Sequence, residues 1–596
     1  MWKSNTYNYK RRASDEVQIG TLKMGGENPV RIQSMANTDT NDIDNSIAQC
    51  IRIVDAGGEL VRFTTQRLKE VDSLHIIHDA IRQQGYQTPI VADIHFNANV
   101  ADYAAQFIEK VRVNPGNYVN GIKTASSNEY TDEEYEQEFK KIEARFTELI
   151  DICKKQHTAI RIGVNHGSLS ERMLVKWGNT PEGMVESCME FLRVFRKKNF
   201  GNIVISMKAS NTVMMIQSVR LLVVRMEEEN FHFPIHLGVT EAGDGEDGRI
   251  KSAVGIGGLL AEGIGDTIRV SLSEEPEAEI PVGELLRDYI TSRSVTTEDI
   301  RPKSDKAVLL ERFKHRDTYR IRNIGGDNLP VVISKSSNHP SLQPDYILKD
   351  GCIVNSNQEI FPIYTFETFV HSTDAELKFL RTNFNELSTT TIHFLKQHSN
   401  VVILLEANVN NPVGEYRAFI HSLVAEDIKT PVILIGKYRE NNLEALQVKA
   451  AADLGIIFVD GLADGILIEN EGSISDKDIL SLSFGILQAT RVRVSKTEFI
   501  SCPGCGRTHF MLQKVIAQIK EKTSHLTGLK IGIMGCIVNG PGEMADADYG
   551  YVGAARGKVS LYKKHECVEK NIPEDAAVDK LIDLIKRNGD WQEPSV

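Results

Sequence analysis

The first 290 residues of the chain alternate between short apolar runs and longer segments whose apolar residues recur every three or four positions. A short apolar run is typical of a buried parallel strand, and the longer spacing is typical of an amphipathic helix. The predicted strands are Val30–Met35, Leu60–Thr64, Pro89–Ile94, Lys110–Val113, Ala159–Val164, Asn202–Met207, Pro234–Val239 and Thr267–Leu272. The helices predicted between them include Ile43–Val54, Ala98–Ile108, Glu182–Phe195 and Val213–Met226. Eight strand–helix repeats favour a (β/α)8 TIM barrel, and an open doubly wound sheet is the alternative.

A Gly-rich turn precedes the first predicted strand of the barrel. Val17–Lys23 and Pro29–Ile32 flank Gly25-Gly26-Glu27-Asn28, a pattern that is typical of a β-hairpin. We expect this hairpin to close the floor of the barrel.

The pattern of apolar and polar residues changes between residues 296 and 490. Predicted strands here are Val331–Ser334, Val401–Leu405, Pro431–Ile435 and Ile456–Phe458, and Asp374–Phe384 has a helical pattern. This segment therefore reads as an inserted α/β domain, which could itself be barrel-like. It holds one cysteine and no cluster of charged residues that indicates a site, so we interpret it as a spacer.

The last hundred residues predict a compact α/β module. Its predicted elements are a strand ending at Phe499-Ile500, a helix over Met511–Lys522, a strand over Lys530–Met534, a hairpin of Gly550–Val552 with Lys558–Leu561, and a helix over Ala576–Lys586. Together, the patterns divide the chain into a barrel domain (1–295), an inserted domain (296–490) and a C-terminal domain (491–596).

Composition narrows the class of protein. The 596 residues include 69 basic and 81 acidic side chains, which gives a formal charge of −12, and 41% of the residues are apolar. These values fit a globular chain of two to four domains and argue against a general nucleic-acid binder. No apolar run is long enough for a membrane span, and no signal core follows the basic N-terminal residues, so we expect a cytoplasmic protein. Eight cysteines are too few for a disulfide scaffold of this length.

Three of the cysteines lie close together near the end of the chain. Cys502-Pro-Gly-Cys505 directly follows a predicted strand, and Cys536 ends the next one. A Cys-x-x-Cys pair alone fits a redox dithiol, a zinc site or an iron–sulfur cluster, and the third cysteine favours a metal. Zinc requires a closed fourth ligand, for which Cys567 or His509 is available.

Another ligand is predicted by the segment that follows Cys536. Asn539-Gly-Pro-Gly is expected to form a tight turn that returns Glu543 toward that cysteine. Three thiolates and one oxygen ligand suit a [4Fe-4S] cluster in which one iron is held less firmly and is able to bind substrate.

Basic residues interrupt five of the predicted barrel strands. They are Arg62, Arg112, Arg161, Lys208 and Arg269. A buried cation is costly unless it is paired, so each residue alone fits an internal ion pair as well as a ligand contact. Five of them at the face where the strands end predict a pocket for a multiply charged anion, a phosphate or diphosphate ester.

Other polar residues stand near the same strand ends. They are Asp93, His95, Asn114, Asn117, Asn165, His166, Thr240 and Glu241. Asp93 and Glu241 are candidates either for counter-ions of the basic residues or for proton-transfer groups, and the sequence leaves both roles open.

Several long motifs resemble one family. They are Gln33-Ser-Met35, Val91-Ala-Asp-Ile-His-Phe96, Arg112-Val-Asn-Pro-Gly-Asn117, Arg161-Ile-Gly-Val-Asn165, His236-Leu-Gly-Val-Thr-Glu-Ala-Gly243, Glu262-Gly-Ile-Gly-Asp-Thr-Ile-Arg-Val-Ser-Leu272, Ser501-Cys-Pro-Gly-Cys505 and Met534-Gly-Cys-Ile-Val-Asn-Gly-Pro-Gly-Glu543. The chain resembles the 4-hydroxy-3-methylbut-2-enyl diphosphate synthases over residues 15–290 and 495–596, in the large three-domain form of that family.

The resemblance implies a reaction and a set of site residues. The substrate would be 2-C-methyl-D-erythritol 2,4-cyclodiphosphate, opened by a two-electron reduction in the methylerythritol phosphate route to isoprenoids. Flavodoxin or ferredoxin would supply the electrons through one [4Fe-4S] cluster held by Cys502, Cys505, Cys536 and Glu543. Glu241, Glu543 and Asn539 would have catalytic roles. The implied substrate-binding residues are Arg62, Asp93, His95, Arg112, Asn114, Asn117, Arg161, Asn165, Lys208, Thr240, Arg269 and Ser271.

The anion pocket and the cysteines fall in different domains, so these domains must close on each other around the substrate. We expect the inserted domain to let the C-terminal domain reach the barrel of its own chain, which is compatible with a homodimer. Two rival functions are a zinc-stabilised barrel lyase or hydrolase and a non-enzymatic iron–sulfur carrier.

Overall fold

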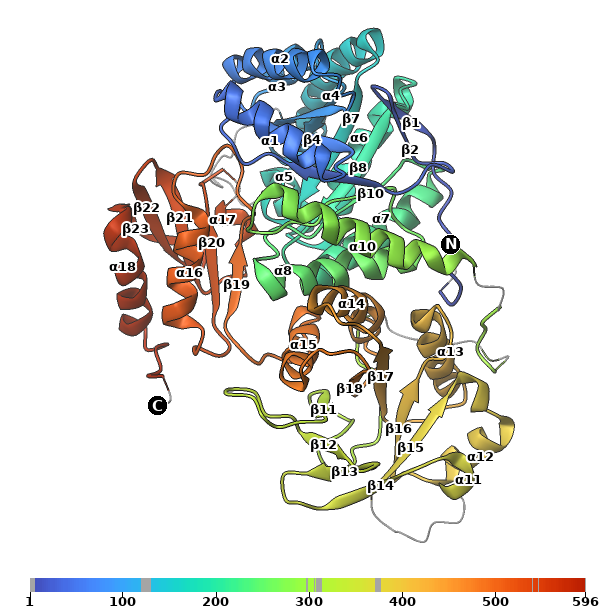
Figure 1. Cartoon of the computed structure of the whole chain (residues 1–596). Coiled ribbons are helices and arrows are strands. Elements are labelled where there is room, and N and C mark those ends of the chain that lie inside the picture. The colour runs from blue at the N-terminus through green and yellow to red at the C-terminus, as the bar shows by residue number, and fades with distance from the viewer. Residues whose placement is uncertain are drawn as a thin grey trace.

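The chain forms two barrels and a smaller C-terminal domain (Figure 1). The computed structural model describes residues 6–118, 130–295, 299–304, 306, 313–369, 377–538, 540–544 and 546–594. The first barrel lies at the top of Figure 1, the second lies below it, and the C-terminal domain lies beside the first. The chain is therefore a mixed α/β protein, as its sequence predicts.

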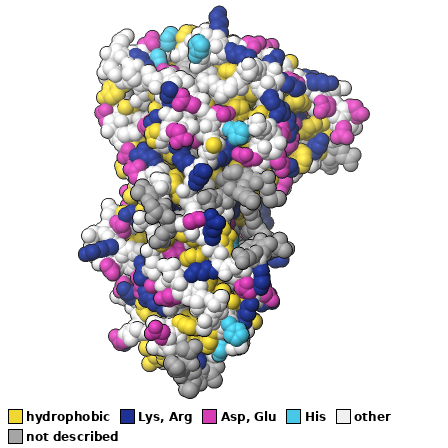
Figure 2. Space-filling view, turned by 90° about the vertical axis from the view of Figure 1, so that its right-hand side faces the viewer, with side chains coloured by type: hydrophobic (Ala, Val, Ile, Leu, Met, Phe, Trp, Pro, Cys, Tyr) yellow, Lys and Arg dark blue, Asp and Glu magenta, His cyan; other side chains and the backbone are white. Residues whose placement is uncertain are grey.

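The visible surface carries both signs of charge. Basic and acidic side chains are intermingled over the face shown in Figure 2, and hydrophobic side chains are scattered between them. Within the described part of the chain, no helix is long and apolar enough to cross a membrane.

The first barrel is an eight-stranded parallel sheet whose order is β8-β7-β6-β5-β4-β3-β10-β9. An isolated bridge between Ile205 and Ile235 links the two ends of this sheet. Its strands are β3 (Arg31–Met35), β4 (Leu60–Thr65), β5 (Ile90–Ile94), β6 (Lys110–Val113), β7 (Ala159–Asn165), β8 (Ile203–Lys208), β9 (His236–Leu237) and β10 (Thr267–Ile268). All eight predicted strands are present, and the TIM-barrel prediction is confirmed.

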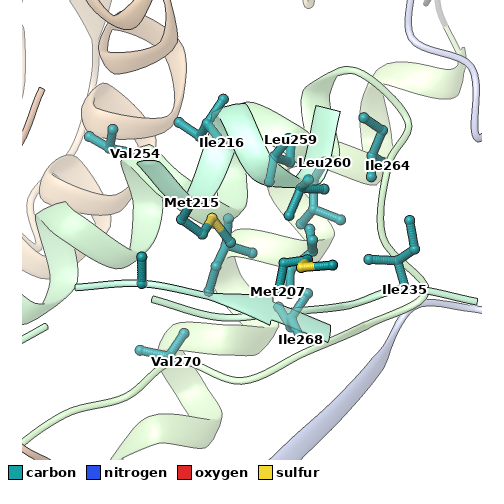
Figure 3. Close-up of a cluster of buried hydrophobic side chains, with 14 of the residues drawn as sticks. Met207, Met215, Ile216, Ile235, Val254, Leu259, Leu260, Ile264, Ile268 and Val270 are labelled. Atoms are coloured by element: carbon teal, nitrogen blue, oxygen red, sulfur yellow. The ribbon is translucent and has the colours of Figure 1, made fainter. Parts of the chain in front are cut away.

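Helices surround this barrel. They are α1 (Ile43–Asp55), α2 (Leu68–Gln83), α3 (Ala98–Ala104), α4 (Asp132–Gln156), α5 (Glu171–Trp177), α6 (Pro181–Lys197), α7 (Thr212–Glu228), α8 (Gly245–Ser252), α9 (Gly258–Ala261) and α10 (Glu279–Thr291). Figure 3 shows one part of the core that they form with the strands. The side chains labelled there are Met207, Met215, Ile216, Ile235, Val254, Leu259, Leu260, Ile264, Ile268 and Val270, and all are buried. Burial of this apolar surface holds the helices on the barrel wall.

The hairpin at the barrel floor turns earlier than its sequence pattern predicts. Strands β1 (Val17–Ile19) and β2 (Leu22–Met24) pair antiparallel, with the turn at Gly20 rather than at the Gly25-Gly26 pair. The hairpin packs on the lowest interior side chains of the barrel, which are Leu60, Val91, Ala159 and Val204. The floor of the barrel is therefore apolar and closed.

The inserted segment forms a second, closed barrel. Its strands are β11 (Val331–Ser334), β12 (Tyr346–Lys349), β13 (Cys352–Asn355), β14 (Ile360–Tyr364), β15 (Lys378–Asn383), β16 (Val401–Glu406), β17 (Val432–Tyr438) and β18 (Gly465–Asn470). Strand β13 runs antiparallel to both β12 and β14, and the other neighbouring strands are parallel. Its helices are α11 (Phe366–Phe369), α12 (Thr389–Gln397), α13 (Pro412–Ala425), α14 (Leu443–Val459) and α15 (Asp476–Ala489).

Two sequence predictions in this segment are wrong. Ile456–Phe458 belongs to helix α14 and is not a strand, because this helix is buried on almost every side and loses the usual polar stripe. Asp374–Phe384 was expected to be a helix, but Lys378–Asn383 is strand β15; residues 374–376 lie outside the described residues. The continuous apolar run around Ile456 allows either structure, and the apolar residues of Asp374–Phe384 fit a helical spacing although part of the segment is a strand, so periodicity alone misassigned both segments.

The two barrels are joined by a tight helix contact and by buried ion pairs. Helix α14 packs on a π-helical turn at Ala253–Gly257, where a side chain on Gly257 would meet Ala452. In the ion-pair network, Arg417 Nη2 lies 2.6 Å from carboxylate oxygens of both Glu262 and Asp460. Arg220 binds the same two carboxylates. This joint fixes the inserted domain on the outside of the first barrel.

The C-terminal domain is a five-stranded sheet of order β19-β20-β21-β22-β23. Its elements are β19 (Glu498–Ser501), α16 (Leu512–Thr523), β20 (Lys530–Met534), α17 (Gly540–Glu543), β21 (Tyr549–Ala555), β22 (Lys558–Lys563), β23 (Glu566–Pro573) and α18 (Glu574–Arg587). Strand β23 was not predicted, because its exposed edge alternates charged and apolar residues without a hydrophobic run.

Candidate active site

A pocket lies between the C-terminal ends of the first barrel's strands and the C-terminal domain. The barrel lines it with Met35, Arg62, Asp93, His95, Arg112, Arg161, Asn165, Ser206, Lys208, Thr240, Glu241, Arg269 and Ser271. The C-terminal domain lines it with Cys502, Pro503, Gly504, Cys505, Arg507, Thr508, Met534, Gly535, Cys536 and Gly540. The structure therefore brings the predicted basic residues and the predicted cysteines to one pocket within one chain.

Backbone contacts seat the C-terminal domain on the barrel. Ala242 forms a parallel bridge with Ser501, and Ser273 Oγ donates a 2.9 Å hydrogen bond to the carbonyl of Cys502. Gly167 and Gly542 touch through their backbones, and a side chain on either residue would overlap the other. A position this close holds the cysteine loops over the mouth of the barrel.

Two of the predicted basic residues are paired with carboxylates. Arg112 Nη1 lies 3.2 Å from Asp93, and Arg269 Nη2 lies 2.9 Å from Glu279. Burial acts to raise the pKa of Asp93, but Arg62 and Arg112 outweigh it and lower that pKa well below its usual range. Asp93 is therefore ionised, and its geometry is that of a counter-ion.

The other three basic residues have no carboxylate partner among the described residues: Arg62, Arg161 and Lys208 form no ion pair there. Burial lowers the pKa of Arg62 to about 10 against the opposing charge of Asp93. Burial, reinforced by neighbouring cations, shifts the pKa values of Arg161 and Lys208 strongly downward. Charges of one sign that are buried without counter-ions favour binding of an opposite charge. This part of the pocket is suited to an anionic ligand.

Two carboxyl groups face each other across the domain boundary. Glu543 binds Asn165 through one carboxylate oxygen and accepts a 3.0 Å hydrogen bond from Thr240 Oγ1 at the other. Burial and then the adjacent Glu543 raise the pKa of Glu241 well above its usual range. Glu241 also has a left-handed backbone (φ 49°), which is uncommon for a non-glycine residue and is typical of functional sites. Its protonated form is therefore available as a proton donor.

The local structure at Glu543 differs from its expected form. The segment Gly540–Glu543 forms the helical turn α17 instead of a tight turn, and the Glu543 carboxylate binds the barrel residues Asn165 and Thr240. Proline is well tolerated near a helix start, which explains why the Gly-Pro-Gly run forms such a turn here. Asn539, which precedes it, lies outside the described residues.

The cysteine loops follow adjacent parallel strands. Cys502 Sγ accepts a 3.2 Å hydrogen bond from the backbone N–H of Gly535, and Cys505 Sγ accepts one from Arg507 Nε at 3.3 Å. Burial raises the pKa of Cys502. Burial acts in the same direction on Cys505, but Arg507 outweighs it and lowers the pKa of that thiol.

The three thiols line one pocket without meeting at one point. Among the described residues, no three Cys, His, Asp or Glu side chains lie close enough to hold a single metal ion. In a four-iron cluster each cysteine binds a different iron, so the thiols need not converge on one atom. This donor set fits a cluster better than it fits a closed zinc site.

Three of the predicted polar residues at the strand ends do not line the pocket but contact groups near it. Asn114 Nδ2 donates a 2.8 Å hydrogen bond to Ser168 Oγ, and Asn117 Nδ2 lies 3.4 Å from His95 Nδ1. His166, from the same set of strand ends, contacts the carbonyl of Asn179. These side chains position neighbouring groups and do not line the cavity.

Sequence reasoning missed Arg507, which lines the pocket and lies 3.6 Å from Asp93. A basic residue two positions after Cys505 was the available signal, since a cation beside a thiol stabilises the thiolate. Glu279, the partner of Arg269, was also missed because it lies on helix α10, away from any motif.

Comparisons with known proteins find family models and relatives that agree with one another. Residues 14–284 match the GcpE TIM-barrel domain, and residues 498–587 match the GcpE protein C-terminal domain. Relatives from Phocaeicola vulgatus and Bacteroides fragilis are each 55% identical to this chain over 98% of its length, and the alignments cover 99% and 97% of the two relatives. A relative from Porphyromonas gingivalis is 47% identical over 98% of this chain and 99% of its own. All three are named 4-hydroxy-3-methylbut-2-en-1-yl diphosphate synthase (flavodoxin). Because these matches run through both domains and the inserted barrel, the chain belongs to the GcpE family.

Proposed function

We propose that the protein reduces 2-C-methyl-D-erythritol 2,4-cyclodiphosphate to 4-hydroxy-3-methylbut-2-enyl diphosphate, a step of isoprenoid biosynthesis. The observation that carries this proposal is the shared pocket, where buried cations without counter-ions face three cysteines from another domain. The names of the full-length relatives give the same reaction product. An anion site and an electron-carrying site in one enclosed space suit the reduction of a phosphorylated substrate.

The cofactor in this proposal is one [4Fe-4S] cluster. Cys502, Cys505 and Cys536 would each hold one iron, and Glu543 is the candidate fourth ligand because it lies on the loop that follows Cys536. Such a cluster supplies electrons one at a time and offers an iron to which a substrate oxygen can bind. To act as a ligand, Glu543 would exchange its bonds to Asn165 and Thr240 for the iron.

The substrate's two phosphates would lie on the unpaired cations of the barrel. Arg62, Arg161 and Lys208 come from three different strands, so they contact a diphosphate from several sides. Arg112 and Arg269, each held by a carboxylate, fix the walls of the pocket. This arrangement presents the carbon skeleton to the cysteine side, since the anion occupies the barrel side.

The reaction breaks the bond between a ring carbon and a phosphate oxygen, removes one hydroxyl group and forms a carbon–carbon double bond. Two electrons enter, and the departing hydroxyl takes up a proton to leave as water. Glu241 is the proposed proton donor, because burial keeps its carboxyl protonated and it lines the pocket. Sealing of the pocket by the C-terminal domain keeps bulk water from competing.

The electron donor in this proposal is flavodoxin, which the relatives' names contain; ferredoxin is the alternative donor. We place the reaction in the cytoplasm. We also place it within a single chain, because the barrel and the C-terminal domain that line the pocket belong to the same chain.

Anaerobic reconstitution with iron and sulfide, followed by turnover with a reduced one-electron donor, tests the function. We expect about four irons per chain, a cluster signature by Mössbauer spectroscopy and formation of the diphosphate product. Arg112→Ala should weaken substrate binding while the iron content stays unchanged. Zinc in place of iron, or a cluster without any binding of the cyclic diphosphate, would favour the rival lyase or carrier functions.

A further inference from the structure

A second layer of polar side chains lies inside the first barrel, below the pocket. Lys110 stands two residues before Arg112 on β6, so both side chains point to the same face of the strand at different depths. In register, Lys110 lies beside Val91 of β5 and Ala159 of β7, which belong to the apolar floor. Lys110 therefore sits between the floor of the barrel and the residues that line the pocket.

Several side-chain atoms in this layer have no hydrogen-bond partner among the described residues. Lys110 is fully buried, and its Nζ has no hydrogen-bond partner in the described part of the chain. The same is true of the side-chain amide of Gln33 and of His236 Nε2, which are also buried. One level higher, Arg161 Nε and Nη1 are likewise unpartnered. Buried polar groups are normally satisfied, so a cluster of unsatisfied ones indicates a function other than stability.

The charges that face Lys110 are almost all positive. Arg62 on β4 and Arg161 on β7 act on it, and His236 on β9 lies within reach of its charge. The nearest acid on a neighbouring strand, Asp93 of β5, is already paired with Arg112. Burial and then these two arginines lower the pKa of Lys110 well below its ordinary value. The free protein therefore favours the neutral amine.

An anion in the pocket reverses this balance. Two negative charges on the cations above Lys110 offset the repulsion from Arg62 and Arg161, and in a medium of low dielectric this offset acts over several ångströms. The energetic cost of a charged ammonium at this depth then falls.

We propose that Lys110 is a positioning residue beneath the anion pocket, which takes up a proton from solvent when a dianionic ligand enters the barrel. This inference rests on the proposed function, because it needs an anion above Lys110. The added charge strengthens the hold on the deepest phosphate without direct contact, since Lys110 does not line the pocket. The proton is bound and no covalent bond changes, so the step needs no other reactant.

Calorimetric titration of the anaerobic holoenzyme with the cyclic diphosphate, in two buffers of different ionisation enthalpy, tests the proposal. This ligand is a cyclic diester of pyrophosphoric acid, and the one acidic oxygen on each phosphate stays ionised near neutral pH, so any proton taken up belongs to the protein. We expect proton uptake on binding near neutral pH, because the free Lys110 is neutral and becomes charged in the complex. Lys110→Met should bind the ligand about tenfold more weakly and take up fewer protons.

Lys437→Met is the matched control, because Lys437 is on a strand of the second barrel and is paired with Glu406. It should leave both the affinity and the uptake as in the wild type. Lys110→Met should also raise the thermal midpoint of the ligand-free protein, since it removes an unpartnered buried amine. Lys110→Gln provides a second variant with the same expected loss of proton uptake.

Three results would overturn the inference. Normal binding by the wild type without proton uptake overturns it and leaves the proposed function intact. Unchanged uptake in both Lys110 variants assigns the proton to another group, such as His236 or Lys208. No binding of the cyclic diphosphate by the wild-type holoenzyme overturns the proposed function, and this inference with it.

Discussion

The two barrels of this chain differ most in whether their basic side chains are paired with carboxylates. In the first barrel, Arg62, Arg161 and Lys208 lie near the C-terminal strand ends without a carboxylate partner among the described residues. In the second barrel, Arg381 lies 2.8 Å from Glu406 and 2.9 Å from Glu469 at the equivalent ends. The interior of the second barrel is apolar, built from side chains such as Ile333, Phe379, Leu404, Ile435 and Leu467.

This difference indicates that a barrel fold does not by itself provide a ligand site. The pairing of its basic side chains with carboxylates decides whether those side chains can bind a ligand. Both barrels present basic side chains where a barrel enzyme places its site. In the first, Arg62, Arg161 and Lys208 form no ion pair with the residues that the structure describes and remain available to a ligand. In the second, Glu406 of β16 and Glu469 of β18 pair with Arg381.

The largest expected effect comes from the cysteines. Cys536→Ser should abolish turnover and lower the iron content of the reconstituted protein, because one ligand of the proposed cluster is lost. Cys352→Ser in the second barrel is the control and should change neither quantity. Iron content and visible absorption under anaerobic conditions give the measurement. A Cys536→Ser protein with full absorption and activity would show that this thiol holds no iron.

Glu241→Gln should lower kcat by about 10²- to 10⁴-fold with little change in substrate affinity, because a proton donor is lost. In the wild type, activity should fall as pH rises through the raised pKa of Glu241. Stability has the same sign: Glu241 stabilises the fold when protonated, and this contribution is lost as pH rises through its folded-state pKa. The variant should therefore gain stability relative to the wild type as pH rises above the ordinary pKa of a carboxyl group. Equal pH–rate profiles for both proteins would remove Glu241 from proton transfer.

A paired charge should matter for stability and not for chemistry. Arg417→Met leaves Glu262 and Asp460 buried with only Arg220 between them, and we expect a loss of about 3–5 kcal/mol in the free energy of unfolding. Substrate affinity of the folded variant should be unchanged. Urea unfolding followed by tryptophan fluorescence measures the first quantity, and calorimetric titration measures the second. An unaltered unfolding midpoint would mean that the network contributes nothing to the joint between the barrels.

An unpaired charge should show the opposite behaviour. Arg161→Met should weaken binding of the cyclic diphosphate about 10- to 100-fold, which corresponds to the loss of a hydrogen bond to a charged group. Its stability should stay equal or rise, because an unpartnered buried guanidinium is removed. Arg381→Met in the second barrel is the matched variant and should leave the affinity unchanged. If Arg161→Met and Arg381→Met bind the cyclic diphosphate equally well, the unpaired charge of Arg161 does not contribute to binding.

Much of the first barrel followed from its pattern of apolar runs, because eight buried parallel strands leave a strong periodic signal. The two errors in the second barrel came from segments whose apolar runs fit either structure. Helix α14 is wrapped by both barrels and has no polar face, and β15 is a short strand next to residues that a helical pattern also fits. In both segments, burial against other parts of the fold determined the secondary structure, and local sequence patterns do not reveal such burial.

The site was predicted in its residue types better than in its pairings. The five predicted basic residues are in the first barrel and line the pocket, but no sequence pattern indicated that Glu279 holds Arg269 or that Arg507 approaches Asp93. The carboxylate of Glu543 was expected beside Cys536 and instead binds Asn165 and Thr240. Such pairings depend on how domains meet, and residues 378 positions apart carry no spacing rule.

The chain passes from α15 of the second barrel to β19 of the C-terminal domain through a short connection. A tether of this length holds the cysteine loops at a high local concentration above their own barrel, in the millimolar range for short linkers. Specific activity should therefore be independent of dilution. It also follows that a Cys536→Ser chain and a weakly binding Arg161→Met chain should not restore each other's activity when mixed, because each barrel is served by its own cysteines.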